Sequence, residues 1–137
     1  MSGAPEQQDL HPNIALLNTI DIRNLDSCAD AFAKDAVFHY FNPKALELQG
    51  DYTGIDGIKQ FFATLDTVTD GTFSVRPINA WPVGDELVVV QTQNTLKWDG
   101  QITVIDVALV WRFVDGKVAE VFDIPSAYSG VTSNPDD

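Results

Sequence analysis

Residues 86–124 have the sequence ELVVVQTQNTLKWDGQITVIDVALVWRFVDGKVAEVFDI, which carries the strongest structural signal in the chain. It contains three runs rich in Val, Ile, Thr and aromatic residues, a composition typical of β-strands. The runs are Glu86–Trp98, Gln101–Phe113 and Lys117–Ile124. Asp99-Gly100 and Asp115-Gly116 separate them, and these residue types tolerate the positive φ angles of tight hairpin turns. These residues therefore predict consecutive antiparallel strands.

A fourth strand is expected immediately before these three. Thr72–Val83 is again rich in strand-forming residues, and Gly84-Asp85 supplies another short turn. Pro77 and Pro82 cannot donate a ladder hydrogen bond, which marks an edge or bulged strand. The second half of the chain is therefore predicted to form a curled antiparallel sheet.

Helices are expected in the first half of the chain. Asn13 after Pro12 can cap a first helix, Asp26 can cap a second, and Gly54 opens a third. Each predicted helix has an apolar stripe that would face a core. The stripes are Ile14, Leu16, Leu17 and Ile20; Leu25, Cys28, Ala29 and Phe32; and Ile55, Ile58, Phe62 and Leu65.

Between the second and third helices, Ala36–Phe41 is typical of a short strand and Pro43–Gln49 of a loop. Helices followed by an antiparallel sheet predict an α+β fold in two layers. At 137 residues the chain has the length of one domain. We expect a flexible N-terminal segment over residues 1–12, the domain over residues 13–125, and an acidic C-terminal tail over residues 126–137.

The composition excludes several classes of protein. A formal net charge of -12 argues against binding to nucleic acid or to an anionic membrane surface. Cys28 is the one cysteine, and His11 and His39 are far apart, so neither an internal disulfide nor a metal site is predicted. No secretory signal or bilayer-spanning apolar stretch is evident, which makes the cytoplasm the expected location.

The predicted strand Gln101–Phe113 is apolar on both faces. One face has Ile102, Val104, Ala108 and Val110, and the other has Ile105, Val107, Leu109 and Trp111. Three short helices can cover only one side of the sheet, so the second face is expected to meet another copy of the chain in a twofold homodimer. The alternative is that the tail of residues 126–137 folds over this face.

The neighbouring strand shows the opposite pattern, because every residue from Gln91 to Thr95 is polar. One of its faces must point inward, and each buried unpaired polar group costs about 1 to 3 kcal/mol. An inward polar row therefore predicts a wet cavity or a bound ligand. The alternative is that these side chains hydrogen-bond one another inside a solid core.

The order of these elements, together with several short segments, resembles the NTF2-like superfamily and, within it, the SnoaL-like (polyketide cyclase-like) branch. The segments are Asn24-Leu25-Asp26, Lys34-Asp35-Ala36-Val37, residues 50–54 and Asp115-Gly116-Lys117-Val118. The resemblance covers roughly residues 13–124. It implies a cone-shaped curved sheet, a cystatin-like α+β barrel, wrapped around the three N-terminal helices. It also implies a deep apolar cavity and dimerisation through the convex face.

The resemblance places one face of each strand in that cavity. The implied cavity residues are Phe38, Tyr40, Val90, Thr92, Asn94, Leu96, Trp98, Ile105, Val107, Leu109, Trp111, Val121 and Asp123. Asp106 and Ala108 then face outward. If Tyr40 lines the cavity, strand alternation points His39 away from it, toward the surface or a dimer contact. Trp81, beside Pro82, is expected to be a packing residue or part of the cavity rim.

Family reactions can be compared with the residues at matching positions. The ketosteroid isomerases use a carboxylate base and an oxyanion pair of a Tyr and a protonated Asp, and the matching positions here hold Tyr40, Leu16 and Leu109. That steroid mechanism is therefore not expected.

The limonene epoxide hydrolases use Asp, Arg and Asp around a water molecule, where this chain has Asn94, Thr92 and Asp123. Only one of the three charged groups is retained, so this reaction is not expected either.

The SnoaL-type polyketide cyclases place an acid/base Asp on the last strand, where this chain has Asp123. Their cavity His matches Leu109. Burial should raise the pKa of Asp123 toward neutrality, which suits a group that both takes and gives a proton. Hydrogen bonding to a ligand without chemistry, and a purely structural role, are the alternatives for this residue.

The leading hypothesis is a cofactor-free cyclase or isomerase acting on a hydrophobic carbonyl compound. Asp123 would be the acid/base, and the ligand would contact Tyr40, Asn94, Thr92, Phe38, Trp98, Trp111, Leu109 and Val121. The alternatives are a carrier of an apolar metabolite and a protein-interaction module that docks through the apolar outer face of the sheet.

Overall fold

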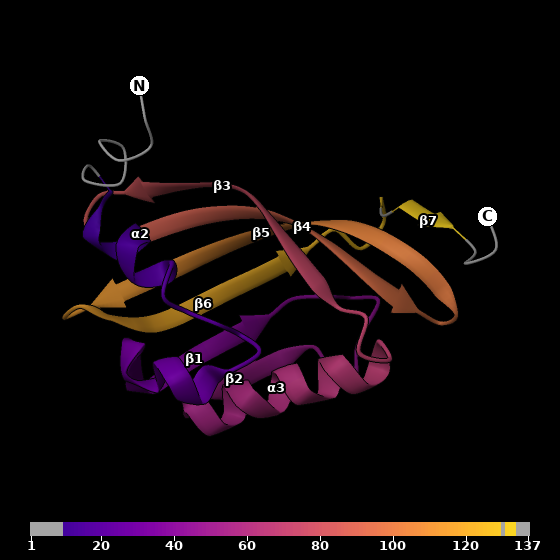
Figure 1. Ribbon diagram of the computed structural model, residues 1–137, viewed down its shortest axis with the longest axis horizontal. Helices are drawn as coiled ribbons and strands as arrows, with labels where there is room; N and C mark the ends of the chain where they lie inside the picture. Colours follow the sequence, from indigo (N-terminus) through magenta and orange to yellow (C-terminus); the bar gives the residue numbers. More distant parts are fainter. Residues whose placement is uncertain (1–9, 130, 134–137) are drawn as a thin grey trace.

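The computed structural model describes residues 10–129 and 131–133, and this part of the chain forms one curved sheet over a long helix (Figure 1). The strands are β1 (Phe32–Tyr40), β2 (Gly50–Thr53), β3 (Ser74–Val83), β4 (Leu87–Trp98), β5 (Gln101–Val114), β6 (Lys117–Pro125) and β7 (Val131–Ser133). The helices are α2 (Pro12–Leu17), the 3-10 helix η1 (Leu25–Ala31) and α3 (Gly54–Val68). The predicted α+β fold with three helices is confirmed.

The meander of the second half is also confirmed. Strands β3 to β6 are antiparallel neighbours joined by tight turns, and the sheet order is β2-β1-β6-β5-β4-β3. Asp99 and Asp115 adopt φ angles of 51° and 53°, the left-handed conformation that these hairpins require. A register shift between Pro77 and Asn79 confirms the bulge predicted in the proline-containing strand.

The sheet as a whole is mixed, because the antiparallel pattern predicted for the second half of the chain does not extend to β1. β1 runs parallel to β6 and antiparallel to β2. β1 and β6 are far apart in the sequence, so no hairpin turn dictates their relative direction. The four-residue strand β2, which directly precedes α3, completes this edge.

The second predicted helix was wrong in type and in length. It is a 3-10 helix that ends at Ala31, and Phe32 begins β1 instead of extending the helical stripe. Its buried residues are Leu25, Cys28 and Ala31, which recur every third position as a 3-10 helix requires.

The core lies between α3 and the concave face of the sheet. Ile58, Phe61 and Leu65 of α3 are buried, and the Phe61 ring packs against Phe38 at 4.8 Å and Tyr40 at 4.9 Å between ring centroids. This packing orients α3 along β1 and closes one side of the sheet, as Figure 1 shows.

The outer face of the sheet carries an apolar row across four strands. Trp81 lies opposite Val89, Val89 opposite Val110, and Val110 opposite Phe122. Trp81 and the nearby Ile124 are 41% and 48% exposed. The strand β7 pairs with residues 102–104 at the edge of β5, so the described part of the tail extends the sheet. The tail was expected to be loose, and residues 1–9, 130 and 134–137 lie outside the described part.

His39 also lies on this outer face, which confirms that it points away from Tyr40. Its imidazole stacks on Phe122 and lies 2.7 Å from an Asp51 oxygen and 3.0 Å from a Glu120 oxygen. Burial opposes protonation of His39, but the hydrogen bonds and charges of the two carboxylates outweigh it and raise the pKa of the imidazole.

Candidate functional site

A cavity of about 120 Å³ lies between the concave face of the sheet, η1 and α3. Its walls are mostly hydrocarbon, with three polar side chains among them. The lining residues are Ile22, Leu25, Phe32, Phe38, Ile58, Phe62, Phe73, Val75, Val90, Thr92, Asn94, Leu109, Trp111 and Asp123. An apolar chamber with a few convergent polar groups is the usual form of a small-molecule site.

Asp123 is the ionisable group in this cavity. Strand pairing places it beside Leu109 of β5 and Tyr40 of β1, deep in the molecule, and the side chain keeps some accessible surface because it faces the void. Burial raises the pKa of the carboxyl group to about 7. Within the described part of the chain, no side chain donates a hydrogen bond to it or forms an ion pair with it.

Thr92 and Asn94 form the second polar feature of the cavity. Both are buried on the inward face of β4, and the Thr92 hydroxyl donates a hydrogen bond of 2.9 Å to Asn94 Oδ1. The sequence left open whether these residues line a cavity or hydrogen-bond one another, and both are true. Because its oxygen is held by Thr92, Asn94 keeps its Nδ2 donors for another acceptor.

Six predicted site residues meet in this cavity. They are Asp123, Asn94, Thr92, Phe38, Leu109 and Trp111. Val121 is buried in the core and does not line the cavity, because its side chain is covered by its neighbours. Tyr40 and Trp98 line a separate pocket of about 130 Å³ with Asn42, Leu96 and Ile105.

The hydroxyl of Tyr40 is engaged in that separate pocket. Asn42 Nδ2 donates a hydrogen bond of 3.1 Å to it, and the ring packs on Phe61. Burial raises the pKa of Tyr40 to about 12. The Asn42 hydrogen bond opposes this shift, and the charge of Asp123 adds to it. The phenol is therefore protonated at neutral pH.

Several lining residues were not predicted as site residues. Ile22 comes from the segment between α2 and η1, Phe73 directly precedes β3, and Val75 lies near the start of that strand. Phe73 and Val75 alternate with polar Ser74, a pattern that could have placed both on the inward face. No comparable signal marks Ile22, because its position depends on how the loop packs.

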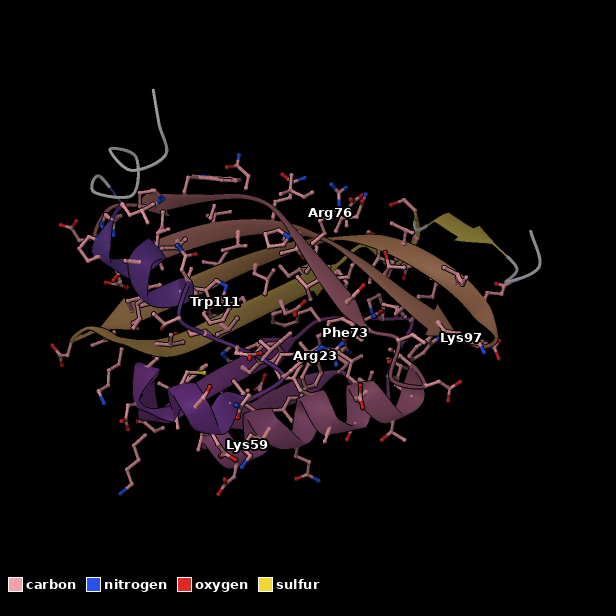
Figure 2. All side chains as sticks on the ribbon, in the orientation of Figure 1. Arg23, Lys59, Phe73, Arg76, Lys97 and Trp111 are labelled. Carbon is pink, nitrogen blue, oxygen red and sulfur yellow. The ribbon has the colours of Figure 1, made fainter. Side chains whose placement is uncertain are left out.

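An outer pocket of about 300 Å³ adjoins the cavity. Four residues, Ile22, Leu25, Phe62 and Phe73, line both spaces. The outer pocket adds the charged residues Arg23, Asp26, Lys59 and Asp66, and Figure 2 shows Arg23 near Phe73 between α3 and the sheet. We call this outer pocket the mouth of the cavity.

In residues 10–129 and 131–133, no three His, Cys, Asp or Glu side chains are grouped as metal ligands. The helices of this part are too short or too polar to cross a membrane.

The model of the SnoaL-like domain matches residues 14–121. This is more than half of the chain, so the chain belongs to the SnoaL-like domain family. A comparison with curated proteins found no significant match.

Solved structures share the NTF2-like fold. TerC, co-crystallised with polyporic acid, is 23% identical, with a TM-score of 0.70 over 84% of this chain and 92% of that chain. An NTF2-like protein of unknown function from Burkholderia pseudomallei is 20% identical, with a TM-score of 0.72 over 83% and 90%. A protein with a ketosteroid isomerase-like fold from Catenulispora acidiphila, in complex with trimethylamine, is 17% identical, with a TM-score of 0.62 over 77% of each chain.

Proposed function

We propose that this protein is a cofactor-free enzyme that moves a proton on a hydrophobic carbonyl compound, with Asp123 as the acid/base. The observation that carries the proposal is an unpaired carboxyl group facing an apolar cavity, with its pKa raised to about 7 by burial. A group with a pKa near the working pH can accept a proton and return it in one turnover. The polyporic acid and trimethylamine complexes of two structural neighbours support small-molecule binding by this fold.

In the proposed reaction, the Asp123 carboxylate removes a proton from a carbon next to the substrate carbonyl. The electron pair of the broken C–H bond moves to the carbonyl oxygen, which becomes an enolate oxygen. The Nδ2 group of Asn94, oriented by Thr92, donates a hydrogen bond to this oxygen. In an isomerisation, Asp123 then returns its proton to another carbon of the enolate system. In a cyclisation, the enolate carbon attacks a second carbonyl carbon of the same molecule, which forms a C–C bond and an alkoxide, and Asp123 gives its proton to that alkoxide.

Deuterium exchange tests the proton-transfer step without knowledge of the natural substrate. 2-Tetralone is a suitable probe because it has an aromatic ring for the apolar walls and acidic C–H bonds beside its carbonyl. The protein should accelerate exchange of these hydrogens in D₂O, with a rate that rises with pH up to about 7 because the base must be ionised. Asp123→Asn should slow the protein-dependent exchange by about 10²- to 10⁴-fold.

Binding of the same probe separates this proposal from a carrier function. Thermal stabilisation by 2-tetralone should persist in Asp123→Asn, because the apolar walls are unchanged. Asp30→Asn, a change of an exposed carboxylate of η1 that does not line the cavity, is the matched control and should leave exchange unaffected. Stabilisation of the wild-type protein without any exchange would contradict the enzymatic proposal and favour a carrier.

We also propose that the outer face forms a twofold homodimer. The apolar row that contains exposed Trp81 and the half-buried Val89, Val110 and Phe122 supports this, because such a surface is costly to leave in water. Val110→Lys, at the centre of the row, should convert a dimer into a monomer in sedimentation velocity runs. Gln60→Lys, on an exposed position of α3 away from this face, is the control. A monomeric wild-type protein at micromolar concentration would contradict the dimer and leave the face free for another protein.

A further inference from the structure

The inner cavity is too small for a whole drug-sized molecule. Its volume of about 120 Å³ is below the range of roughly 300 to 1,000 Å³ of most ligand sites, and the cavity reaches that range only together with the mouth. A ligand that places its carbonyl beside Asp123 therefore extends past Ile22 and Phe73 into the mouth. The mouth then contributes to the choice of ligand.

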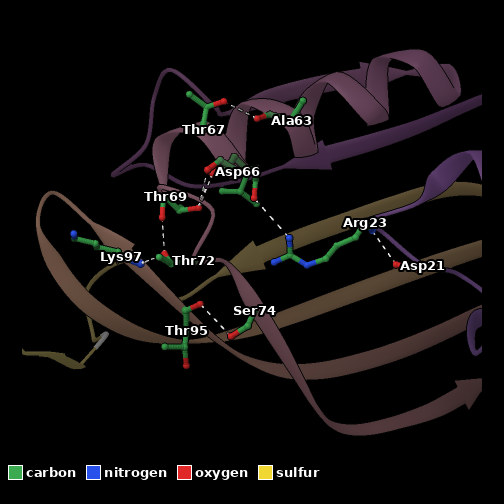
Figure 3. A network of polar contacts seen from close by, with 11 residues as sticks. Asp21, Arg23, Ala63, Asp66, Thr67, Thr69, Thr72, Ser74, Thr95 and Lys97 are labelled. Atoms are coloured by element: carbon green, nitrogen blue, oxygen red, sulfur yellow. Dashed lines mark hydrogen bonds and ion pairs between the residues drawn. The ribbon is translucent and has the colours of Figure 1, made fainter. Parts of the chain in front are cut away.

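The charged residues of the mouth are paired unequally. Lys59 Nζ lies 2.8 Å from Asp26 Oδ1, at hydrogen-bond distance. Arg23 Nη1 lies 3.6 Å from Asp66 Oδ1, beyond normal hydrogen-bond length, and both side chains are 55% exposed. Figure 3 shows this contact between the loop that carries Arg23 and α3.

Arg112 of the same molecule is fully paired and serves as a comparison for Arg23. Its guanidinium contacts both Glu86 and Glu120, and the Glu120 contact measures 2.9 Å. Arg23, in contrast, makes no side-chain hydrogen bond within the described residues. Its planar fork of N–H donors is therefore available at the edge of an apolar cavity.

Asp66 can leave Arg23 without disturbing α3. The backbone around Asp66 is held independently, since Gly71 N donates to the Asp66 carbonyl at 2.8 Å and Thr69 Oγ1 donates to the Leu65 carbonyl at 2.8 Å. The Asp66 side chain is 55% exposed, so solvent can reach its carboxylate. Exposed ion pairs contribute little to stability, so exchanging Asp66 for another anion on Arg23 costs little.

We propose that the ligand of the cavity is an acid, whose carboxylate or similar anionic group binds Arg23 at the mouth in place of Asp66. The apolar body then lies between Phe62 and Phe73, and the carbonyl reaches Asp123. This inference rests on the proposed function and adds a substrate class to it, that of hydrophobic keto acids. Arg23 is the specificity-determining residue, because it selects for charge far from the reacting carbon.

A pair of probes that differ in charge tests this inference. 3-(4-Acetylphenyl)propanoate has an aryl ketone at one end and a carboxylate at the other, with the ring between them, and 3-(4-acetylphenyl)propanamide has the same shape without the charge. Calorimetric titration of the full chain at low salt should show that the acid binds about three- to tenfold more tightly than the amide. Added salt should reduce this preference, because the mouth is open to solvent.

Two variants localise the effect. Arg23→Gln should abolish the preference for the acid and leave the affinity for the amide unchanged. Asp66→Asn should strengthen acid binding, because it removes the competing carboxylate. Arg76→Gln is the matched control, because it removes the same charge. Arg76 of β3 donates a hydrogen bond to Gln93 of β4 and lines neither the mouth nor the cavity.

The outcomes distinguish this inference from the proposed function. Equal affinities of the wild-type protein for acid and amide, or an unchanged acid preference in Arg23→Gln, would overturn the inference and leave the Asp123 reaction intact. Absence of binding by both probes would overturn the inference together with the proposed ligand site. Loss of the preference in Arg76→Gln would show a general charge effect and would also overturn the role of Arg23.

Discussion

Replacing Asp123 with Asn should make the stability of this protein less dependent on pH. The pKa of Asp123 is raised from 3.8 to about 7 in the folded protein, so the unfolded chain releases this proton at a lower pH than the folded protein does. Stability from this group is therefore fully present below pH 4 and is lost as the pH rises toward 7. Asn has nearly the same shape and cannot ionise, so the variant does not share this loss.

The size of the effect follows from the shift. A difference of about three pKa units corresponds to about 4 kcal/mol between the limits of low and high pH. Within the practical window from pH 5 to pH 8, the expected change is about 2 to 3 kcal/mol. Because other groups titrate in both proteins, the difference between variant and wild type isolates the contribution of Asp123.

Urea unfolding of both proteins at several pH values measures this difference. The free energy of unfolding of Asp123→Asn, relative to wild type, should increase by about 2 to 3 kcal/mol between pH 5 and pH 8. Asp30→Asn, which changes an exposed carboxylate of η1 outside the cavity and the mouth, should show no comparable trend. A constant difference between Asp123→Asn and wild type across this range would refute the reasoning, because it would mean that the carboxyl group is not desolvated.

Three other variants test the packing, the polar pair and the outer face. Ile58→Ala removes a 1%-exposed side chain that lines the cavity. It should lower the free energy of unfolding in urea titrations by about 2 to 5 kcal/mol, and a loss below about 1 kcal/mol would contradict the place of Ile58 in the core. Thr92→Val should weaken binding of 2-tetralone in thermal-shift assays, since Asn94 loses the hydrogen bond that orients it; unchanged binding would argue against a role for this pair. His39→Gln should lower the free energy of unfolding more at pH 6 than at pH 9. The raised pKa means that the charged imidazole stabilises the fold, and this stabilisation is lost as the pH rises. An equal loss of stability at both pH values would contradict the ion pairs with Asp51 and Glu120.

The order of the elements could be predicted because the strands are separated by residues with clear turn chemistry. Asp99 and Asp115, each followed by Gly, mark the hairpin turns by local sequence alone. The short strand β2 could not be predicted, since its four residues are ordered by pairing with β1. The 3-10 helix was missed because its burial period of three resembles the first turns of an α-helical pattern.

The site could be predicted in part for similar reasons. Strand alternation together with the family resemblance placed Asp123 and Asn94 on the inward face, and both line the cavity. Alternation also placed Tyr40 on the inward face. The alternation pattern does not tell which of two pockets an inward side chain lines, and Tyr40 lines the pocket beside the cavity. The ring of Phe61, from a helix distant in sequence, packs against both Phe38 and Tyr40, yet these residues line different pockets. The mouth was missed because Arg23 lies in a loop, where periodic patterns give no orientation.

Carbon-13 NMR of the aspartate side chains gives the most direct test of the central claim, which is that burial in the cavity raises the pKa of one carboxyl group to about 7. The carboxyl signal absent from spectra of Asp123→Asn identifies the residue, and its chemical shift can be followed from pH 3 to pH 9. The account predicts a midpoint near 7. A midpoint near 4, the ordinary value for an aspartate in water, would contradict it.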